Sequence, residues 1–232
     1  MAGVRLAGLT KHYRRGSETI RALEDVSLDI DPGEFVAVVG RSGSGKTTML
    51  DLLGLLLKPT AGSLVIDDVE TTRLSDRDLA HLRARKVGFV FQEYNLLSGL
   101  NVLENVMLPL RYVKDGKNGR ARAVELIDRV GLTDRIKHRP TELSGGQMQR
   151  TAIARSMVNQ PSLILLDEPT GAVDTETAQQ LVDLLKRLNS EDKVTIVLVT
   201  HDTDVAGQAK RQIRLKDGRV LSDERVGEAV PV

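Results

Sequence analysis

The stretch GRSGSGKTT, residues 40–48, constrains the fold of this chain more than any other. It matches G-x-x-x-x-G-K-[ST] from Gly40 to Thr47, with the apolar run FVAVV before it and TMLDLLGLL after it. The backbone N–H groups of such a turn point at phosphate oxygens, and the N-terminus of the following helix adds partial positive charge. The sequence therefore predicts a strand, a phosphate-binding loop and a helix in that order.

This loop predicts contacts to a nucleoside triphosphate. Lys46 would reach the β- and γ-phosphates, and the Thr47 hydroxyl would bind Mg²⁺. The alternative is a glycine-rich turn that matches by chance, which the flanking strand and helix patterns disfavour. We assign the nucleotide contacts of the loop to Gly40, Arg41, Ser42, Gly43, Ser44, Gly45, Lys46, Thr47 and Thr48.

Short apolar runs alternate with helical patterns along the chain. Continuous apolar runs of this kind are typical of strands that are buried on both faces of a parallel sheet. We expect such strands at Phe35 to Val39, Val87 to Phe91, Leu163 to Leu166 and Val194 to Val199. The prediction is an α/β fold with a P-loop NTPase core and a mostly parallel sheet.

Two segments depart from this pattern. Val26, Leu28 and Ile30 alternate with polar residues, which predicts an N-terminal antiparallel β-subdomain. Between Asn101 and Gly131 apolar residues recur at helical spacing (Val102, Val106, then Val124, Ile127 and Val130), interrupted by the loop KDGKNGR. We predict a single domain over residues 1–232, with residues 1–91 and 160–232 forming the core and residues 92–159 an inserted helical subdomain.

Composition excludes several classes of protein. The 33 Lys and Arg residues balance 32 Asp and Glu residues, so the chain lacks the basic excess of a nucleic-acid-binding protein, and we expect no nucleic-acid partner. It has no cysteine, which excludes disulfides and thiolate metal sites. The N-terminus lacks a secretory signal pattern, and no apolar run approaches the roughly 18 residues of a membrane span. Any membrane role would come through a partner.

Two adjacent carboxylates, Asp167 and Glu168, follow the apolar run LILL. Carboxylates beside a buried strand are costly unless they are paired with a cation, and Mg²⁺ at the phosphate site would supply one. We therefore predict that Asp167 is a metal-side carboxylate and that Glu168 accepts the proton of an attacking water. A strand-end turn with solvated acids is the alternative.

A second glycine turn lies in TELSGGQMQR, residues 141–150, before a helical pattern that runs from Gln147 to Met157. The start of a helix after a glycine turn can bind an anion. No lysine follows these glycines, so this turn cannot duplicate the charge of the first one. It is suited to completing a site that lies elsewhere.

Together these motifs resemble those of ABC-type ATPase cassettes. Residues 40–48, Gln92, LSGGQ at 143–147, LILLDEP at 163–169 and His201 occur in the order and approximate spacing of that family, and the resemblance covers nearly all 232 residues. It implies an ATPase that uses ATP and Mg²⁺. It also implies a head-to-tail dimer in which Ser144, Gly145, Gly146 and Gln147 cap the ATP held by the other chain.

The resemblance implies roles for single residues as well. Gln92 would sense Mg²⁺ and the attacking water, and His201 would contact the γ-phosphate and orient Glu168. Asp174 would reach across the dimer, and Tyr13 would stack on adenine unless it is an ordinary half-buried sheet tyrosine. The implied catalytic residues are Glu168, His201, Gln92 and Lys46, and the implied metal site is Thr47, Gln92 and Asp167.

Three function classes fit a cassette of this kind. The first is the ATPase subunit of a transporter whose membrane permease is a separate chain, which would place this chain at the cytoplasmic face of the membrane as a peripheral protein. The second is a mechanotransmission ATPase that drives cell-wall or division factors without transport. The third is a soluble ATPase acting on ribosomes or DNA, which usually carries two cassettes or a long coiled-coil insertion.

Within the family, GFVFQEYNLL, LENVMLPL and the PTG before Asp174 resemble the group that serves lipoprotein release, macrolide export and antimicrobial-peptide resistance. Three features depart from that group: GAVD, LLGLLLKPTAG and Met148.

The remaining motifs carry no further function. The other histidines have no metal-ligand spacing, DRVG at 128–131 lacks a guanine-reading partner motif, and RDLAHLRARK reads as a charged helix face. We assign no metal to His12, His81 or His138.

Overall fold

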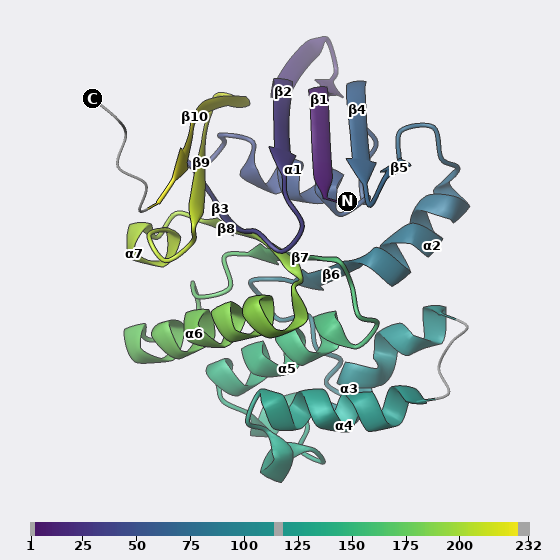
Figure 1. The fold of residues 1–232 in the computed structure, drawn as a ribbon, viewed down its shortest axis with the longest axis vertical. Coiled ribbons are helices and arrows are strands. Elements are labelled where there is room, and N and C mark those ends of the chain that lie inside the picture. Colours follow the sequence, from purple (N-terminus) through teal and green to yellow (C-terminus); the bar gives the residue numbers. More distant parts are fainter. Residues whose placement is uncertain (1–2, 114–117, 227–232) are drawn as a thin grey trace.

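The computed structural model describes residues 3–113 and 118–226 of the chain. Its centre is a six-stranded sheet in the order β10-β9-β3-β8-β7-β6, in which only the β9–β10 pair is antiparallel (Figure 1). The strands are β3 (Phe35–Val39), β6 (Val87–Val90), β7 (Leu163–Asp167), β8 (Thr195–Thr200), β9 (Arg211–Lys216) and β10 (Arg219–Arg225). The four predicted buried strands and the mostly parallel α/β fold are confirmed.

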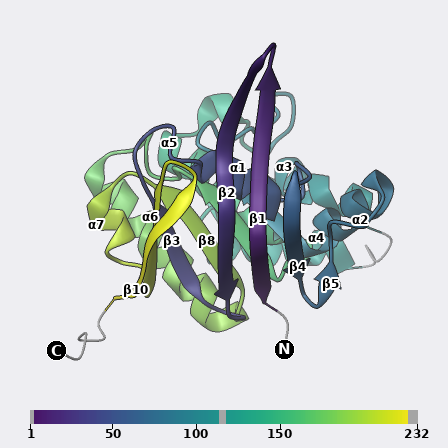
Figure 2. The same cartoon turned by 90° about the horizontal axis from the view of Figure 1, so that it is seen from above.

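A second, antiparallel sheet has the order β2-β1-β4-β5. Its strands are β1 (Val4–Arg15), β2 (Glu18–Ile30), β4 (Ala61–Ile66) and β5 (Val69–Glu70). Val26, Leu28 and Ile30 are buried, as their alternation predicts. The sequence predicts an N-terminal antiparallel subdomain, and the structure adds β4 and β5, which follow α1 in the chain. β4 pairs with β1, and β5 pairs with β4. The long β1–β2 hairpin extends beyond the other strands (Figure 2).

The helices cover both faces of the central sheet. The α-helices are α1 (Lys46–Leu53), α2 (Asp76–Lys86), α3 (Val102–Met107), α4 (Gly119–Arg129), α5 (Gly145–Met157), α6 (Thr175–Asp192) and α7 (Thr203–Ala206). Short 3-10 helices are η1 (Leu108–Tyr112), η3 (Thr133–Arg135) and η4 (Pro140–Glu142). None of these helices, within residues 3–113 and 118–226, has the length and apolar character needed to span a bilayer.

Alternate residues of the central strands build two hydrophobic cores. Val36 and Val38 of β3 face α1 and the antiparallel sheet, whereas Phe35 and Ala37 face the helices α3 to α6. The same alternation holds in β7 and β8. Because both faces are covered, these strands need apolar side chains on both sides, which explains their unbroken apolar sequence.

The helical pattern between Asn101 and Gly131 forms α3 and α4, which pack with α5 below the sheet (Figure 1). Val102, Val106, Ile127 and Val130 are buried there. The expectation that Val124 shares this face is wrong, since its side chain is exposed. Four residues of the predicted KDGKNGR loop, 114–117, lie outside the described residues.

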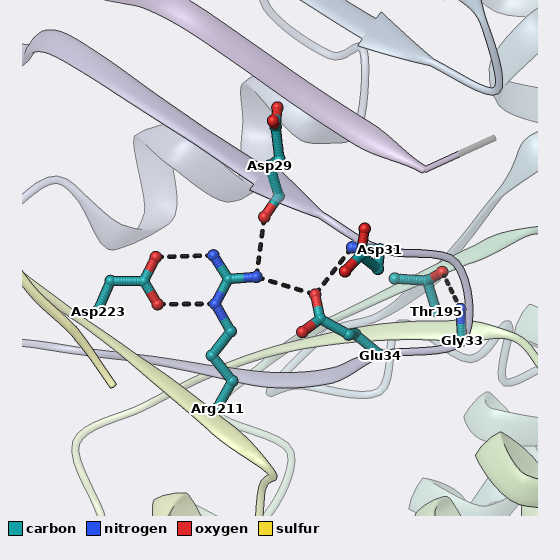
Figure 3. Close-up of polar contacts among 7 residues, drawn as sticks. All are labelled: Asp29, Asp31, Gly33, Glu34, Thr195, Arg211 and Asp223. Atoms are coloured by element: carbon teal, nitrogen blue, oxygen red, sulfur yellow. Dashed lines mark hydrogen bonds and ion pairs between the residues drawn. The ribbon is translucent and has the colours of Figure 1, made fainter. Parts of the chain in front are cut away.

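Arg211 of β9 ties the end of the central sheet to the antiparallel sheet (Figure 3). Its side chain is 12% exposed and bonds both carboxylate oxygens of Asp223 on β10, each at 2.7 Å. It also donates to a carboxylate oxygen of Glu34 at 2.9 Å and to the carbonyl oxygen of Asp29 at 2.8 Å. The Asp223 carboxylate, and then Glu34, raise the pKa of this guanidinium above its ordinary value. One side chain therefore joins β9, β10, β2 and the β2–β3 connection.

We expect Arg211→Lys to lower the free energy of unfolding by about 1–3 kcal/mol, because an ammonium group cannot reproduce the bidentate bond to Asp223 together with the other two contacts. Arg211→Ala should cost roughly 3–5 kcal/mol, because it leaves the carboxylates without their partner. Urea denaturation measures both, with the exposed Arg214→Lys on the same strand as control. Equal stability of Arg211→Lys and Arg214→Lys would contradict this role.

Candidate nucleotide-binding and catalytic site

Four parallel strands of the central sheet end at one edge, and the predicted catalytic groups follow these ends. Gly40 follows β3, His201 follows β8, Glu168 follows β7, and Gln92 lies two residues beyond β6. The strand order β3-β8-β7-β6 makes the four connections neighbours. The carboxyl edge of an open parallel sheet is where such folds bind ligands.

A cavity of about 580 Å³ lies at this edge, a volume typical of small-molecule sites. It brings together most of the residues predicted from the first glycine loop and from the strand ends. The predicted residues that line it are Tyr13, Ser42, Gly43, Gly45, Lys46, Thr47, Thr48, Gln92, Asp167, Glu168 and His201. Gly40, Arg41 and Ser44 line a second hollow of about 650 Å³ on the other side of the loop, together with β9.

The phosphate-binding loop is built around Lys46. The Nζ atom of Lys46 donates to the carbonyl oxygens of Gly40 at 2.7 Å and Arg41 at 3.1 Å, so the loop curls around the ammonium group. The Oγ atom of Ser44 is buried and has no hydrogen-bond partner among the described residues. The central ammonium and the N-terminus of α1 form a donor set that fits phosphate oxygens.

Glu168 and His201 form a pair at the ends of β7 and β8. The ring atom Nδ1 of His201 lies 2.8 Å from Oε1 of Glu168, and the Thr200 hydroxyl donates to Oε2 at 3.2 Å. The Glu168 side chain is 16% exposed and that of His201 is 73% exposed. Glu168 has a left-handed backbone with φ of 45°, a conformation that is costly for a glutamate and that clusters at functional sites. The carboxylate is therefore held in a fixed orientation by two neighbours.

Burial raises the pKa of Asp167, and the negative charges of Glu168 and Asp51 raise it further. A divalent cation would relieve this repulsion, and the Asp167 carboxylate and the Thr47 hydroxyl supply the oxygen ligands that Mg²⁺ prefers. Sequence reasoning missed Asp51 of α1, whose own pKa is raised by burial. Its signal is a lone carboxylate in an apolar run, four residues after Thr47 and hence on the same helix face.

Tyr13 of β1 also lines the cavity, with Ile20 and Ala22 of β2. The Nζ atom of Lys11 lies 5.3 Å from the centre of the Tyr13 ring. Tyr13 is 36% exposed, which leaves ring surface for a planar ligand. This geometry is compatible with both interpretations of Tyr13, a base-stacking residue and a half-buried sheet tyrosine.

The loop after Gln92 is tied to α5, a link that the sequence did not reveal. Arg155 of α5 is buried and donates to the carbonyl oxygens of Tyr94 at 2.7 Å and Asn95 at 2.5 Å. Both residues have left-handed backbones, with φ of 60° and 49°. A buried guanidinium thus holds a strained loop next to the predicted sensing residue. An arginine within the apolar part of α5 was the available signal.

The second glycine turn lies away from the cavity. Ser144 caps α5 by accepting a hydrogen bond from the N–H of Gln147, whose side chain bonds back to the N–H of Ser144. Asp174 caps α6 by accepting hydrogen bonds from the N–H and the hydroxyl of Thr177, and these bonds lower the pKa of Asp174. The residues that the structure does not bring to the cavity of their own chain are Ser144, Gly145, Gly146, Gln147 and Asp174.

Comparison with known proteins identifies the family. A family model described as "ABC transporter" matches residues 23–171. The chain is 48% identical over 228 residues to an uncharacterized ABC transporter ATP-binding protein of Methanocaldococcus jannaschii, MJ0796, covering 96% of this chain and 97% of that protein. It is 46% identical over 225 residues to the macrolide export ATP-binding/permease protein MacB of Rhodopirellula baltica, covering 96% of this chain but 33% of that protein.

Two solved structures of MJ0796 resemble the structure of this chain. A dimeric structure of a post-hydrolysis state of the ATP-binding cassette MJ0796, bound to ADP and Pi, matches with a TM-score of 0.88 at 46% identity, covering 97% of this chain and 100% of that one. A second dimeric structure of MJ0796, described as a bacterial ABC transporter cassette, matches with the same TM-score of 0.88. Agreement of the family model, the sequence relatives and the fold leads to one conclusion: this chain belongs to the ABC transporter family.

Proposed function

We propose that this chain is the ATP-binding and ATP-hydrolysing subunit of an ABC transporter, in which ATP-driven pairing of two copies moves a separate membrane permease. One observation carries the proposal. The phosphate loop and the strand-end groups share one cavity, while the second glycine turn lies outside it. A second copy would supply the missing turn.

Phosphoryl transfer needs charge stabilisation and an in-line water, and different residues of the cavity would supply each of these. Lys46 and the loop N–H groups bind the phosphates. Glu168 takes the proton of the attacking water, and His201 keeps its carboxylate in place. Asp167, Thr47 and Gln92 would hold Mg²⁺, with Asp51 nearby, and Mg²⁺ when bound would add positive charge beside the phosphates.

The second glycine turn suits a role across an interface. Ser144 and the first N–H groups of α5 stand at a helix N-terminus, which favours a phosphate group. The matched solved structures of MJ0796 are dimers, one of them with ADP and Pi. In a head-to-tail pair, each turn would close the ATP site of the other copy, and loss of the γ-phosphate would release it.

A groove of about 540 Å³ on another face fits a permease segment. Its walls include the apolar side chains of Leu56, Phe89, Phe91 and Tyr112, and Leu56 and Tyr112 are 46% and 69% exposed. Arg155, which holds the loop after Gln92, also lines it. A helix docked there would contact the same loop that borders the catalytic cavity.

The MacB relative, whose name joins an ATP-binding part and a permease, supports a permease partner and an export-type role for this chain. The chain spans about a third of that relative's length. Docking on a permease would place this chain at the cytoplasmic face of the membrane. The substrate would be selected by the permease.

We expect Glu168→Gln to retain ATP binding but to lower turnover by roughly 10²- to 10⁴-fold, since this is the usual contribution of a general base. ATP-bound dimer should accumulate, which analytical ultracentrifugation with ATP and Mg²⁺ measures. The control is Glu125→Gln, an exposed glutamate on α4. Hydrolysis by Glu168→Gln at the parental rate would show that Glu168 is not the base.

We expect Ser144→Ala to abolish hydrolysis while ATP affinity of the monomer stays unchanged, because the hydroxyl would act on the other copy's nucleotide. The substitution also removes a helix cap, which costs about 1 kcal/mol. Ser75→Ala removes the equivalent cap of α2 and serves as control. The ATPase rate and the affinity for a fluorescent ATP analogue at low protein concentration separate the two effects. A parallel loss of both quantities in Ser144→Ala would argue for a site within one chain.

A further inference from the structure

The two-residue turn between β9 and β10, Asp217 and Gly218, contacts both halves of the nucleotide site. We propose that Gly218 is a spacer between the phosphate-binding loop and the base-facing strand β2, and so sets the distance between the two surfaces that bind one nucleotide. This inference rests on the proposed nucleotide-binding function. It assigns a positioning role to a residue more than 150 positions from the phosphate loop in sequence.

Gly218 is hydrogen-bonded to both halves. Its N–H donates to the carbonyl oxygen of Ser44 in the phosphate loop at 3.1 Å, and its carbonyl oxygen accepts from the N–H of Glu24 on β2 at 2.9 Å. The phosphate loop and β2 are therefore joined through the backbone of a single residue. Their separation therefore depends on the position of Gly218, together with the direct approach of Gly45 to Ala22.

The junction has no room for a side chain at Gly218. A Cβ atom there would lie 2.9 Å from the carbonyl oxygen of Ala22, 3.1 Å from the carbonyl carbon of Ala22 and 3.2 Å from the Cα atom of Leu23. A Cβ atom at Gly45, in the phosphate loop, would lie 2.4 Å from the same oxygen of Ala22 and 3.5 Å from the Cα atom of Gly218. All the atoms near Gly218 belong to backbone, which cannot rotate away as a flexible side chain can.

The turn itself is rigid enough to act as a spacer. Lys216 and Arg219 pair across it, so only two residues connect the strands. Asp217 and Gly218 have φ of 48° and 76°, the pair of left-handed residues that defines a type I′ hairpin turn. Aspartate tolerates this conformation at the first position and glycine adopts it freely at the second.

A change at Gly218 would alter the affinity for ATP more than the affinity for inorganic tripolyphosphate. Ala22 and Ile20 of β2 line the base side of the cavity with Tyr13, whereas Ser42, Gly43, Gly45 and Lys46 line the phosphate side. A Cβ atom at Gly218 presses on β2, so the base side would shift relative to the phosphate loop. ATP touches both sides, but inorganic tripolyphosphate touches only the loop.

The test compares the dissociation constants of ATP and tripolyphosphate, both with Mg²⁺, for the parent chain and Gly218→Ala by isothermal titration calorimetry. We expect ATP affinity to fall roughly tenfold or more, in line with the large effects of small misplacements, while tripolyphosphate affinity changes little. The control is Gly131→Ala, whose left-handed φ of 72° carries the same backbone strain. The nearest atom to a Cβ atom there is 3.6 Å away, on Arg150, and the site is remote from the cavity.

If Gly218 had a purely structural role, Gly218→Ala would lower the affinities for ATP and tripolyphosphate by the same factor. The ratio of the two affinities would then stay unchanged, as expected for Gly131→Ala. An unchanged ratio of ATP affinity to tripolyphosphate affinity in Gly218→Ala would contradict the spacer role of Gly218. If Gly218→Ala does not fold, Gly218→Asn keeps the added Cβ atom with less backbone strain, and Gly131→Asn becomes its control. A parent chain that binds neither ligand would instead refute the proposed nucleotide site.

Discussion

The hydrogen-bonded pairing of four parallel strands, β3, β8, β7 and β6, is the constraint on which the site depends. Each strand ends at the same edge, and each leads within a few residues to side chains or backbone that line the catalytic cavity. Both faces of these strands are buried, so a shift in their packing would disturb two cores at once. The sheet thus fixes the relative positions of groups that lie up to about 160 residues apart in sequence.

Much of this arrangement was predictable because the signals are local. Unbroken apolar runs identified the parallel strands, and the glycine pattern identified the phosphate loop between Phe35 and Leu53. The pairing of β4 with β1 was not predictable, since it joins segments separated by the whole of α1. The hydrogen bonds between Arg155 of α5 and the loop after Gln92 were not predictable either, because one arginine in a helix does not reveal its partners. The roles assigned to the individual site residues stay predictions.

In the proposed function, the cavity of one chain would supply the groups for phosphate binding and for attack by water, and a second copy would close it at the γ-phosphate. The capped N-termini of α5 and α6 carry the groups suited to this closure. The groove beside Arg155 offers a route by which the state of the cavity could reach a permease, because the same arginine holds the loop after Gln92. Nucleotide binding, pairing and docking would then be linked through the direct hydrogen bonds of Arg155 to this loop.

A mixing experiment tests the central claim that two copies share each ATP. Lys46→Ala removes the phosphate-binding charge but keeps the second glycine turn, whereas Ser144→Ala does the reverse. Each variant alone should be inactive. Mixed together, they should regain ATPase activity, since a mixed pair contains one site with a native phosphate loop and a native turn. A mixture as inactive as its separate components, although the two chains are shown to pair, would contradict the shared site.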